Sequence, residues 1–334
     1  MTAIIAADAV CKTFHQLKRQ TGLGGAIRSL LSRQYTDIRA VDGISFTIQP
    51  GEAVGYLGPN GAGKSTMIKM MTGILVPSSG TLSVLGREPH ANRMVNAAEI
   101  GVVFGQRSQL WWDLPVRDSF ALNRHIYDIA ETRFAENLAY LTRMLDMASY
   151  LDRPVRQLSL GQRMRAEIAM ALLHDPKILF LDEPTIGLDV VAKDAVRKFL
   201  AEINHKRGTT IILTTHDLVD IEEICPRLIM VDDGKLLFDG ELTRLRATLG
   251  SRRRLTLEFD TDPGPLALTT ATLTTDLGAA KHYLLEREET SLLDVLNEVG
   301  RGRGLKDVKL EEPDIEEVIR TFYQNKPGLA GTAP

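Results

Sequence analysis

A glycine-rich stretch in the first quarter of the chain carries the residue types that bind a phosphate chain. It fits the pattern G-x-x-x-x-G-K-[ST] without a substitution and reads Gly58-Pro59-Asn60-Gly61-Ala62-Gly63-Lys64-Ser65-Thr66. Its glycines permit backbone conformations in which successive amide N–H groups converge on phosphate oxygens at a helix N-terminus. We expect Lys64 to reach the β- and γ-phosphates and the Ser65 hydroxyl to ligate Mg²⁺. The stretch predicts a nucleoside triphosphate site, and the alternative is a glycine-rich turn with an incidental lysine.

Two adjacent carboxylates end an apolar run farther along the chain. Asp182 and Glu183 close the run 177–183, where a carboxylate can meet Mg²⁺ and its neighbour can polarise a water. We expect Asp182 to hold the metal through its water shell and Glu183 to be the general base for the water that attacks the γ-phosphorus. The alternative is a solvated acidic turn before Pro184.

Two further polar residues follow apolar runs of the same kind. His216 comes after the run 210–214, where its side chain can approach the γ-phosphate, although a histidine at a strand end is often only structural. Gln106 comes after the run 100–104 and could hold Mg²⁺ or the attacking water. Both are candidates for the catalytic site.

The elements that must position these residues alternate between apolar runs and helical patterns. The run 177–183 has continuous apolar character, which suits a parallel strand that is buried on both faces, and the runs 210–214 and 228–231 follow it. The predicted strands span residues 3–14, 44–57 (with a turn at 49–52), 81–85, 100–104, 177–183, 210–214 and 228–231. Helical patterns cover 118–149 and a helix that Ser159 caps and that runs to 174. The order predicts an α/β fold with a mainly parallel sheet and ligands at the carboxyl ends of its strands.

A basic insertion at residues 15–38 interrupts the first strands. Within it, residues 26–33 place Ile27, Leu30 and Leu31 on one helical face. The segment could lie near a membrane or a partner, or it could be a surface helix that covers the sheet.

The character of the chain changes after residue 240. Alternating runs at 252–259, 281–286 and 307–311 predict strands, and 291–299 and 313–322 predict helices. We therefore expect a domain at 1–240 and a small accessory α+β domain at 241–334, which lacks an evident chemical constellation.

The bulk composition excludes several classes of protein. With 40 basic and 43 acidic residues among 334, the chain gives no reason to expect nucleic acid as its main partner. Cys11 and Cys225 lack metal spacing and suit a reducing, cytosolic compartment. The N-terminus lacks the features of a signal peptide, and no apolar run is long enough to span a membrane. We expect a cytoplasmic protein.

Six separated motifs together resemble those of ABC transporter ATPase subunits. In order and spacing they match the Walker A motif, Q-loop, signature, Walker B motif, D-loop and switch histidine. The matching residues are 58–66, Gln106, Leu158-Ser159-Leu160-Gly161-Gln162, 178–184, Gly187-Leu188-Asp189 and His216. Leu160 departs from the pattern because it replaces the usual first glycine of the signature.

The resemblance covers roughly residues 4–240 and implies an antiparallel subdomain and an inserted helical subdomain at about 107–172. It implies ATP and Mg²⁺ as cofactors, and a head-to-tail dimer in which Ser159, Gly161 and Gln162 of one copy face the γ-phosphate bound by the other. Asp189 of the D-loop would join the same site. An aromatic residue stacks on adenine in this family, and Phe14 is the candidate by position, with Tyr35 as the rival.

A narrower resemblance concerns ATPases of bacterial daunorubicin and viologen exporters. It rests on residues 103–107, on 111–115 with Trp111 and Trp112, on the basic insertion and on the C-terminal domain. It implies an exporter ATPase that binds integral membrane permease subunits at the cytoplasmic face of the membrane. Trp111 and Trp112 would then contact the permease, or else pack within the helical subdomain. The remaining alternatives are an importer ATPase and a soluble ABC ATPase that acts on ribosomes or nucleic acid.

Overall fold

The computed structural model describes residues 2–17, 35–105, 108–249, 253–285, 291–300, 303–311 and 315–324. The chain divides into two compact units, Met1–Gly240 and Glu241–Pro334, and each is described by itself.

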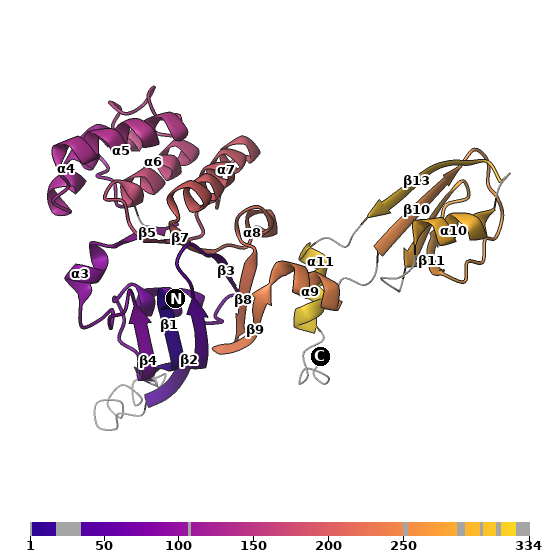
Figure 1. Cartoon of the computed structure of the whole chain (residues 1–334), viewed down its shortest axis with the longest axis horizontal. Coiled ribbons are helices and arrows are strands. Elements are labelled where there is room, and N and C mark those ends of the chain that lie inside the picture. Colours follow the sequence, from indigo (N-terminus) through magenta and orange to yellow (C-terminus); the bar gives the residue numbers. More distant parts are fainter. Residues whose placement is uncertain are drawn as a thin grey trace, which may run out of the picture. The chain divides into compact units, whose positions relative to one another are not determined.

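A six-stranded sheet forms the centre of the first unit (Figure 1). Its strands lie in the order β5-β6-β7-β3-β8-β9, and those from β5 to β8 pair in parallel. Every residue of β7 is buried, which confirms the burial on both faces predicted for its apolar run, and the neighbouring strand β3 is buried throughout as well. The strands are β3 (Ala53–Leu57), β5 (Ile100–Phe104), β6 (Ile178–Asp182), β7 (Thr210–Thr214), β8 (Arg227–Asp232) and β9 (Lys235–Glu241).

A smaller antiparallel sheet lies on the other side of helix α2 (Lys64–Met71) and has the order β2-β1-β4. Met67, Ile68, Met70 and Met71 of α2 are buried in one core that joins residues of both sheets. The helix that follows the glycine-rich stretch is thereby held on both sides. The strands are β1 (Ile5–Leu17), β2 (Tyr35–Ile48) and β4 (Ser79–Val84).

The predicted limits of the basic insertion, 15–38, are wrong at both ends. Leu17 pairs with Tyr35 and Phe14 pairs with Ile38, so the hairpin of β1 and β2 extends into the predicted insertion. The extension is exposed and mostly polar, and apolar periodicity therefore gave no sign of it. Residues 18–34, with the helix predicted at 26–33, lie outside the described residues.

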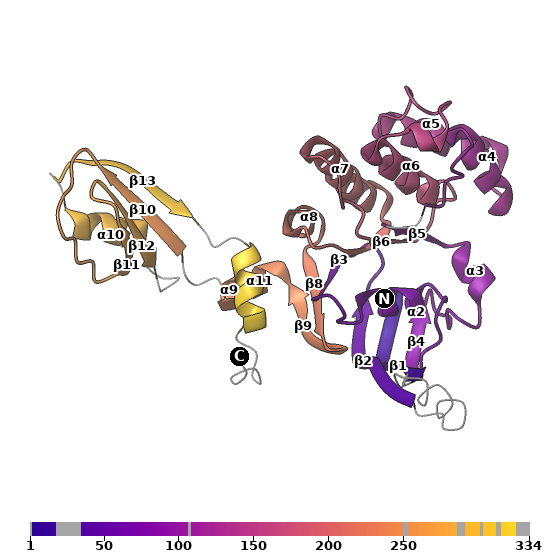
Figure 2. The same ribbon diagram turned by 180° about the vertical axis from the view of Figure 1, so that it is seen from behind.

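Helices gather along the parallel sheet, and α4, α5 and α6 lie together in both views (Figures 1 and 2). The single helical pattern predicted at 118–149 is two helices, because the chain turns at Asp128 with a left-handed φ of 50°. The helix that Ser159 caps ends at Leu172, two residues before the predicted end. The helices are α3 (Arg93–Ala97), α4 (Val116–Ile126), α5 (Glu131–Met144), a 3-10 turn (Val155–Gln157), α6 (Leu160–Leu172), α7 (Val190–Arg207) and α8 (Leu218–Ile224).

The second unit is an antiparallel sheet with helices, in the strand order β11-β12-β10-β13 (Figure 2). Leu255, Leu257, Tyr283 and Leu285 of the sheet pack with Val295 of α10. Ser291 caps α10 in a capping box with Asp294. Its elements are α9 (Leu242–Leu249), β10 (Arg253–Phe259), β11 (Ala271–Asp276), β12 (Ala280–Leu285), α10 (Leu292–Val299), β13 (Leu305–Glu311) and α11 (Ile315–Gln324). Within the described ranges of both units, no helix has the length and apolar character needed to cross a membrane.

Candidate functional site

The glycine-rich stretch forms a tight loop between β3 and α2, as predicted. Gly63 has a φ of 96°, and a Cβ at this position would lie 2.2 Å from the Ala40 carbonyl oxygen. A Cβ at Gly58 would lie 2.4 Å from the Val231 carbonyl oxygen. Side chains at these two positions would therefore push the loop away from the strands on either side. The amide groups at the start of α2 remain available to an anion.

Lys64 is nearly buried in this loop, with 8% of its surface exposed. Its Nζ donates hydrogen bonds to the carbonyl oxygens of Gly58 at 2.6 Å and Pro59 at 3.1 Å. Burial lowers the pKa of the Lys64 ammonium, while the negative charges of Glu183 and Asp182 oppose that shift. The cation of the loop is therefore close enough to both carboxylates to sense their charge.

The two carboxylates lie at the carboxyl end of β6, beside the loop. The Ser65 Oγ donates to Asp182 Oδ2 at 3.4 Å, and the Thr214 Oγ1 donates to Asp182 Oδ1 at 2.6 Å. His216 Nε2 lies 2.9 Å from Glu183 Oε1. The structure thus brings Lys64, Ser65, Asp182, Glu183 and His216 together, although they come from three separate parts of the sequence.

Glu183 has an unusual backbone conformation, with a left-handed φ of 59°. Its N–H donates to the Thr214 carbonyl oxygen at 2.9 Å, and its carbonyl oxygen accepts from Ile186 N–H at 3.4 Å. The side chain is 22% exposed and faces His216. A non-glycine residue in this region is strained, and such strain is concentrated at functional sites.

A buried polar network lies behind these residues, and no motif in the sequence predicts it. Asp220, which has no exposed surface, accepts from Arg197 Nε at 2.5 Å, from Thr215 Oγ1 at 3.0 Å and from the Thr185 hydroxyl. Asp217 accepts from Lys193 Nζ at 2.6 Å. The network ties α7 and α8 to the loops that carry Glu183 and His216. Its only signal in the sequence is the spacing of Lys193 with Arg197 and of Asp217 with Asp220, which puts each pair on one helical face.

The predicted signature residues lie at the N-terminus of α6. Ser159 Oγ accepts from Gln162 N–H at 3.2 Å, and Gln162 Oε1 accepts from Ser159 N–H at 3.0 Å, so the predicted cap is confirmed as a capping box. Leu160 is 39% exposed, and its Cδ2 would lie 2.7 Å from a Cβ on Gly187. A side chain at Gly187 would therefore displace the tip of Leu160.

Asp189 and Gly161 lie in the adjoining helix contact. Asp189 caps α7, and its Oδ1 accepts from Ala192 N–H at 2.8 Å. A Cβ on Gly161 would lie 3.1 Å from the Ala192 Cβ. The starts of α6 and α7 are thus closely packed.

The remaining predicted residues lie away from this group or outside the described ranges. Phe14 and Tyr35 are 38% and 51% exposed on the hairpin of β1 and β2, where Lys12 lies 5.3 Å from the centre of the Phe14 ring. Trp111 and Trp112 are each 53% exposed, so neither is a core residue. Gln106 lies outside the described residues.

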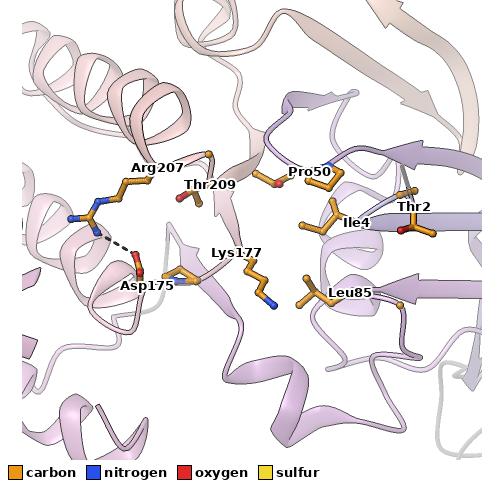
Figure 3. Close-up of a pocket in the computed structure, with 13 residues that line it drawn as sticks. Thr2, Ile4, Pro50, Leu85, Asp175, Lys177, Arg207 and Thr209 are labelled. Carbon is orange, nitrogen blue, oxygen red and sulfur yellow. Dashed lines mark hydrogen bonds and ion pairs between the residues drawn. The ribbon is translucent and has the colours of Figure 1, made fainter. Parts of the chain in front are cut away.

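A cavity of about 700 Å³ lies at the edge of the parallel sheet that is opposite to the glycine-rich loop (Figure 3). Its walls include Lys177, which precedes β6, Thr209, which precedes β7, and the pair of Asp175 with Arg207 at 3.2 Å. These are the amino ends of the strands, whereas the loop and the carboxylates lie at the carboxyl ends. The cavity is therefore separate from the candidate site.

Comparisons with known proteins identify relatives of this chain. The model of the family described as ABC transporter matches residues 41–186. A methionine import ATP-binding protein, MetN 2 of Bacillus licheniformis, is 31% identical over 304 residues, which cover 89% of this chain and 83% of that protein. A Nod factor export ATP-binding protein I of Burkholderia pseudomallei is 37% identical over 214 residues, which cover 63% of this chain and 68% of that protein.

A solved structure shares the fold. The structure of cbiO1 from Clostridium perfringens, part of the ABC transporter complex cbiONQ, has a TM-score of 0.60 and 26% identity. The likeness covers 74% of this chain and 92% of cbiO1. The predicted α/β fold with antiparallel and helical subdomains is thus confirmed.

Proposed function

Since the chain belongs to the ABC transporter family, as an ATP-binding subunit and an ATPase, we propose that it powers a transporter whose membrane-spanning permease subunits are separate chains. The observation that carries this proposal is the group of Lys64, Ser65, Asp182, Glu183 and His216 at one edge of the sheet. A cation for phosphate, oxygen ligands for a metal and a carboxylate paired with a histidine are the parts that γ-phosphate hydrolysis needs.

The oxygen atoms of Ser65 and Asp182 suit Mg²⁺. They lie 3.4 Å apart on neighbouring elements and are hard ligands of the kind that this ion takes together with water and phosphate. Ser65 would hold it directly, Asp182 through its water shell, and Gln106 is a further candidate ligand. Bound there, the ion would neutralise charge on the β- and γ-phosphates.

The protein groups divide the remaining work between them. Lys64 and the amides of residues 58–66 bind and orient the phosphates. Glu183 accepts the proton of the attacking water, and His216, 2.9 Å from it, orients that carboxylate and contacts the γ-phosphate. The Thr214 hydroxyl holds Asp182 at 2.6 Å and fixes the side chain that meets the metal shell.

The proposed working form is a head-to-tail dimer of two copies. The N-terminus of α6, with Ser159, Gly161 and Gln162, would meet the γ-phosphate held by the second copy, because amide groups and the helix dipole favour an anion there. Val190 and Val191, beside Asp189 at the start of α7, are both 80% exposed and would be covered by the partner. Phe14 is the proposed adenine contact and Tyr35 the rival.

We favour export as the direction, on the resemblance to daunorubicin and viologen exporters and to the Nod factor export protein. The likeness to the methionine import protein keeps an importer as the second candidate. In either case the exposed Trp111 and Trp112 would contact a permease at the cytoplasmic face of the membrane. The unit Glu241–Pro334 is proposed as an accessory domain.

Replacing Glu183 tests the catalytic assignment. Glu183→Gln keeps the shape of the side chain and removes the proton acceptor, so ATP turnover should fall about 10²–10⁴-fold, the usual contribution of a general base. Binding of a fluorescent ATP analogue should be retained. Glu136→Gln, an exposed carboxamide substitution on α5, is the control and should leave turnover unchanged. Normal turnover in the Glu183 variant would exclude the proposed base.

A further inference from the structure

A short segment after β5 contains both tryptophans of the chain. We call residues 108–114 the tryptophan segment; the sequence has 2 Trp in total, and both are there. Backbone hydrogen bonds join it to the 3-10 turn before the signature: Val155 N–H donates to the Leu114 carbonyl oxygen and Arg156 N–H to that of Trp112, each at 3.0 Å. The turn ends two residues before Ser159. One end of the segment is therefore fixed to the chain that leads into α6.

The other end of the segment is fixed to α6 itself by a buried carboxylate. Glu167 is 5% exposed, and its Oε2 accepts from Gln109 N–H at 3.0 Å. Its Oε1 accepts from the Ser108 hydroxyl and, at 3.5 Å, from Leu110 N–H. Arg163, one turn earlier on the same helical face, lies 5.8 Å from the centre of the Trp112 ring.

This carboxylate is strongly bound to the segment. A buried charge is tolerated when its oxygens are satisfied by hydrogen bonds, and each donor here comes from residues 108–110. Burial raises the pKa of Glu167, and the hydrogen bonds from Ser108, Gln109 and Leu110 offset only part of that rise. Separating the segment from α6 would leave both the carboxylate and the backbone N–H groups without partners, so the two should move as one body.

We propose that Glu167 is a positioning residue that couples the tryptophan segment to the signature end of α6. A displacement at the exposed Trp111 and Trp112 would then reach Ser159 through α6, and nucleotide held against Ser159 would shift the tryptophans. The inference rests on the proposed function for the role of Ser159, whereas the attachment through Glu167 stands on the contacts alone.

Intrinsic fluorescence tests the coupling, because the full chain has no tryptophan outside the segment. The parent is Glu183→Gln, which should hold ATP without turning it over, and the readouts are tryptophan emission and acrylamide quenching during a titration with MgATP. Glu167→Gln, Ser108→Ala and the control Glu136→Gln are each added to the parent. We expect ATP to change the emission of the parent and the control, and this change to be lost in Glu167→Gln and reduced in Ser108→Ala. ATP affinity should stay within about twofold, since Glu167 is buried against residues 108–110 and is not one of the proposed nucleotide ligands.

A role in folding alone would give a different result. It would lower the melting temperature of the Glu167 variant but leave the ATP-induced fluorescence change intact, and that outcome would overturn the coupling without touching the proposed function.

In the background with Glu183 intact, Glu167→Gln should lower kcat about tenfold with little change in KM. A tenfold loss corresponds in free energy to about one charge-assisted hydrogen bond.

Failure of the proposed function would also be recognisable. If the wild-type chain did not hydrolyse ATP, that proposal would fall, and the attachment would still be tested without nucleotide. Loss of the Glu167 carboxylate should then raise the acrylamide quenching constant of the tryptophans, and an unchanged constant would overturn the attachment.

Discussion

Neutralising the buried carboxylate of Asp220 should destabilise the first unit far more than neutralising a carboxylate at the surface. Asp220 has no exposed surface and accepts hydrogen bonds from Arg197, Thr185 and Thr215. Asp220→Asn keeps the volume but removes the charge that faces Arg197, and one of its carboxylate acceptors becomes an amide donor. Arg197, itself 8% exposed, would lose its closest carboxylate partner.

The expected loss follows from these contacts. Breaking a buried ion pair by removing one partner destabilises a protein by about 3–5 kcal/mol. The lower end of this range applies, because Arg197 keeps Asp217 at 3.3 Å and Glu223 at 3.8 Å. For a unit of this size, a loss of about 3 kcal/mol should lower the melting temperature by roughly 6–12 °C.

Thermal and urea unfolding followed by tryptophan fluorescence would measure the effect, since Trp111 and Trp112 report on the first unit. The control is Asp194→Asn, which removes the partner of Lys198 from an exposed pair on α7 and should leave stability unchanged within error. A double variant, Asp220→Leu with Arg197→Met, should recover part of the loss because no buried charge remains unpaired. Equal losses for Asp220→Asn and Asp194→Asn would refute the reasoning.

Three further predictions concern the loop, a buried histidine and the second unit. Gly63→Ala should weaken binding of a fluorescent ATP analogue by more than about tenfold, since the backbone strain and the contact with the Ala40 carbonyl together cost more than roughly 1.4 kcal/mol. The control is Gly61→Ala, where φ is similar but the space around the new Cβ is open, and it should weaken binding less. Equal losses of affinity in the two variants would contradict the steric argument. Burial lowers the pKa of His174 below 6.5, and the hydrogen bond to the Ile100 carbonyl and the charge of Asp175 only oppose this shift. As the pH falls below 6.5, the unfolded chain therefore takes up a proton at His174 before the folded chain does. The stability that neutral His174 contributes is lost over that range. Urea unfolding at pH 7.5 and 5.5 should show a smaller pH difference in His174→Phe, and an unchanged difference would exclude this residue. Removal of residues 241–334 should leave a cooperative melting transition, and MgATP should raise its melting temperature. Loss of that transition would show that the first unit needs the second unit in order to fold.

The sequence predicted those elements whose side chains meet an apolar surface along their whole length. Residues 100–104 and 210–214 are uniformly apolar or small, and they are strands with the predicted limits. The ends of β1 and β2, the edge strand β9 and strand β11 were missed or cut short, because many of their side chains are partly or fully exposed. Apolar periodicity in a sequence indicates which side chains are buried. These strands are held mainly by backbone hydrogen bonds, which leave no pattern in the sequence.

The site was predictable where one short motif carries its chemistry. Lys64 and Ser65 follow from the glycine-rich stretch, and the pair of Asp182 and Glu183 follows from its place after a buried strand. The contacts of Asp220 and Glu167 could not be predicted, because each joins residues that are separated in the sequence and meet only in the fold. Local patterns thus identify the groups that touch a ligand but not the buried groups that hold them in place.

The left-handed backbone of Glu183 sets a limit on how this chain could be redesigned for stability. A glycine would adopt a φ of 59° without strain, whereas a side chain there is held against a penalty of about 1–3 kcal/mol. Selection for heat resistance alone should therefore favour Glu183→Gly and discard the carboxylate. Thermostable libraries of this protein would have to be screened for turnover as well as for melting temperature, because at this position the two properties call for different residues.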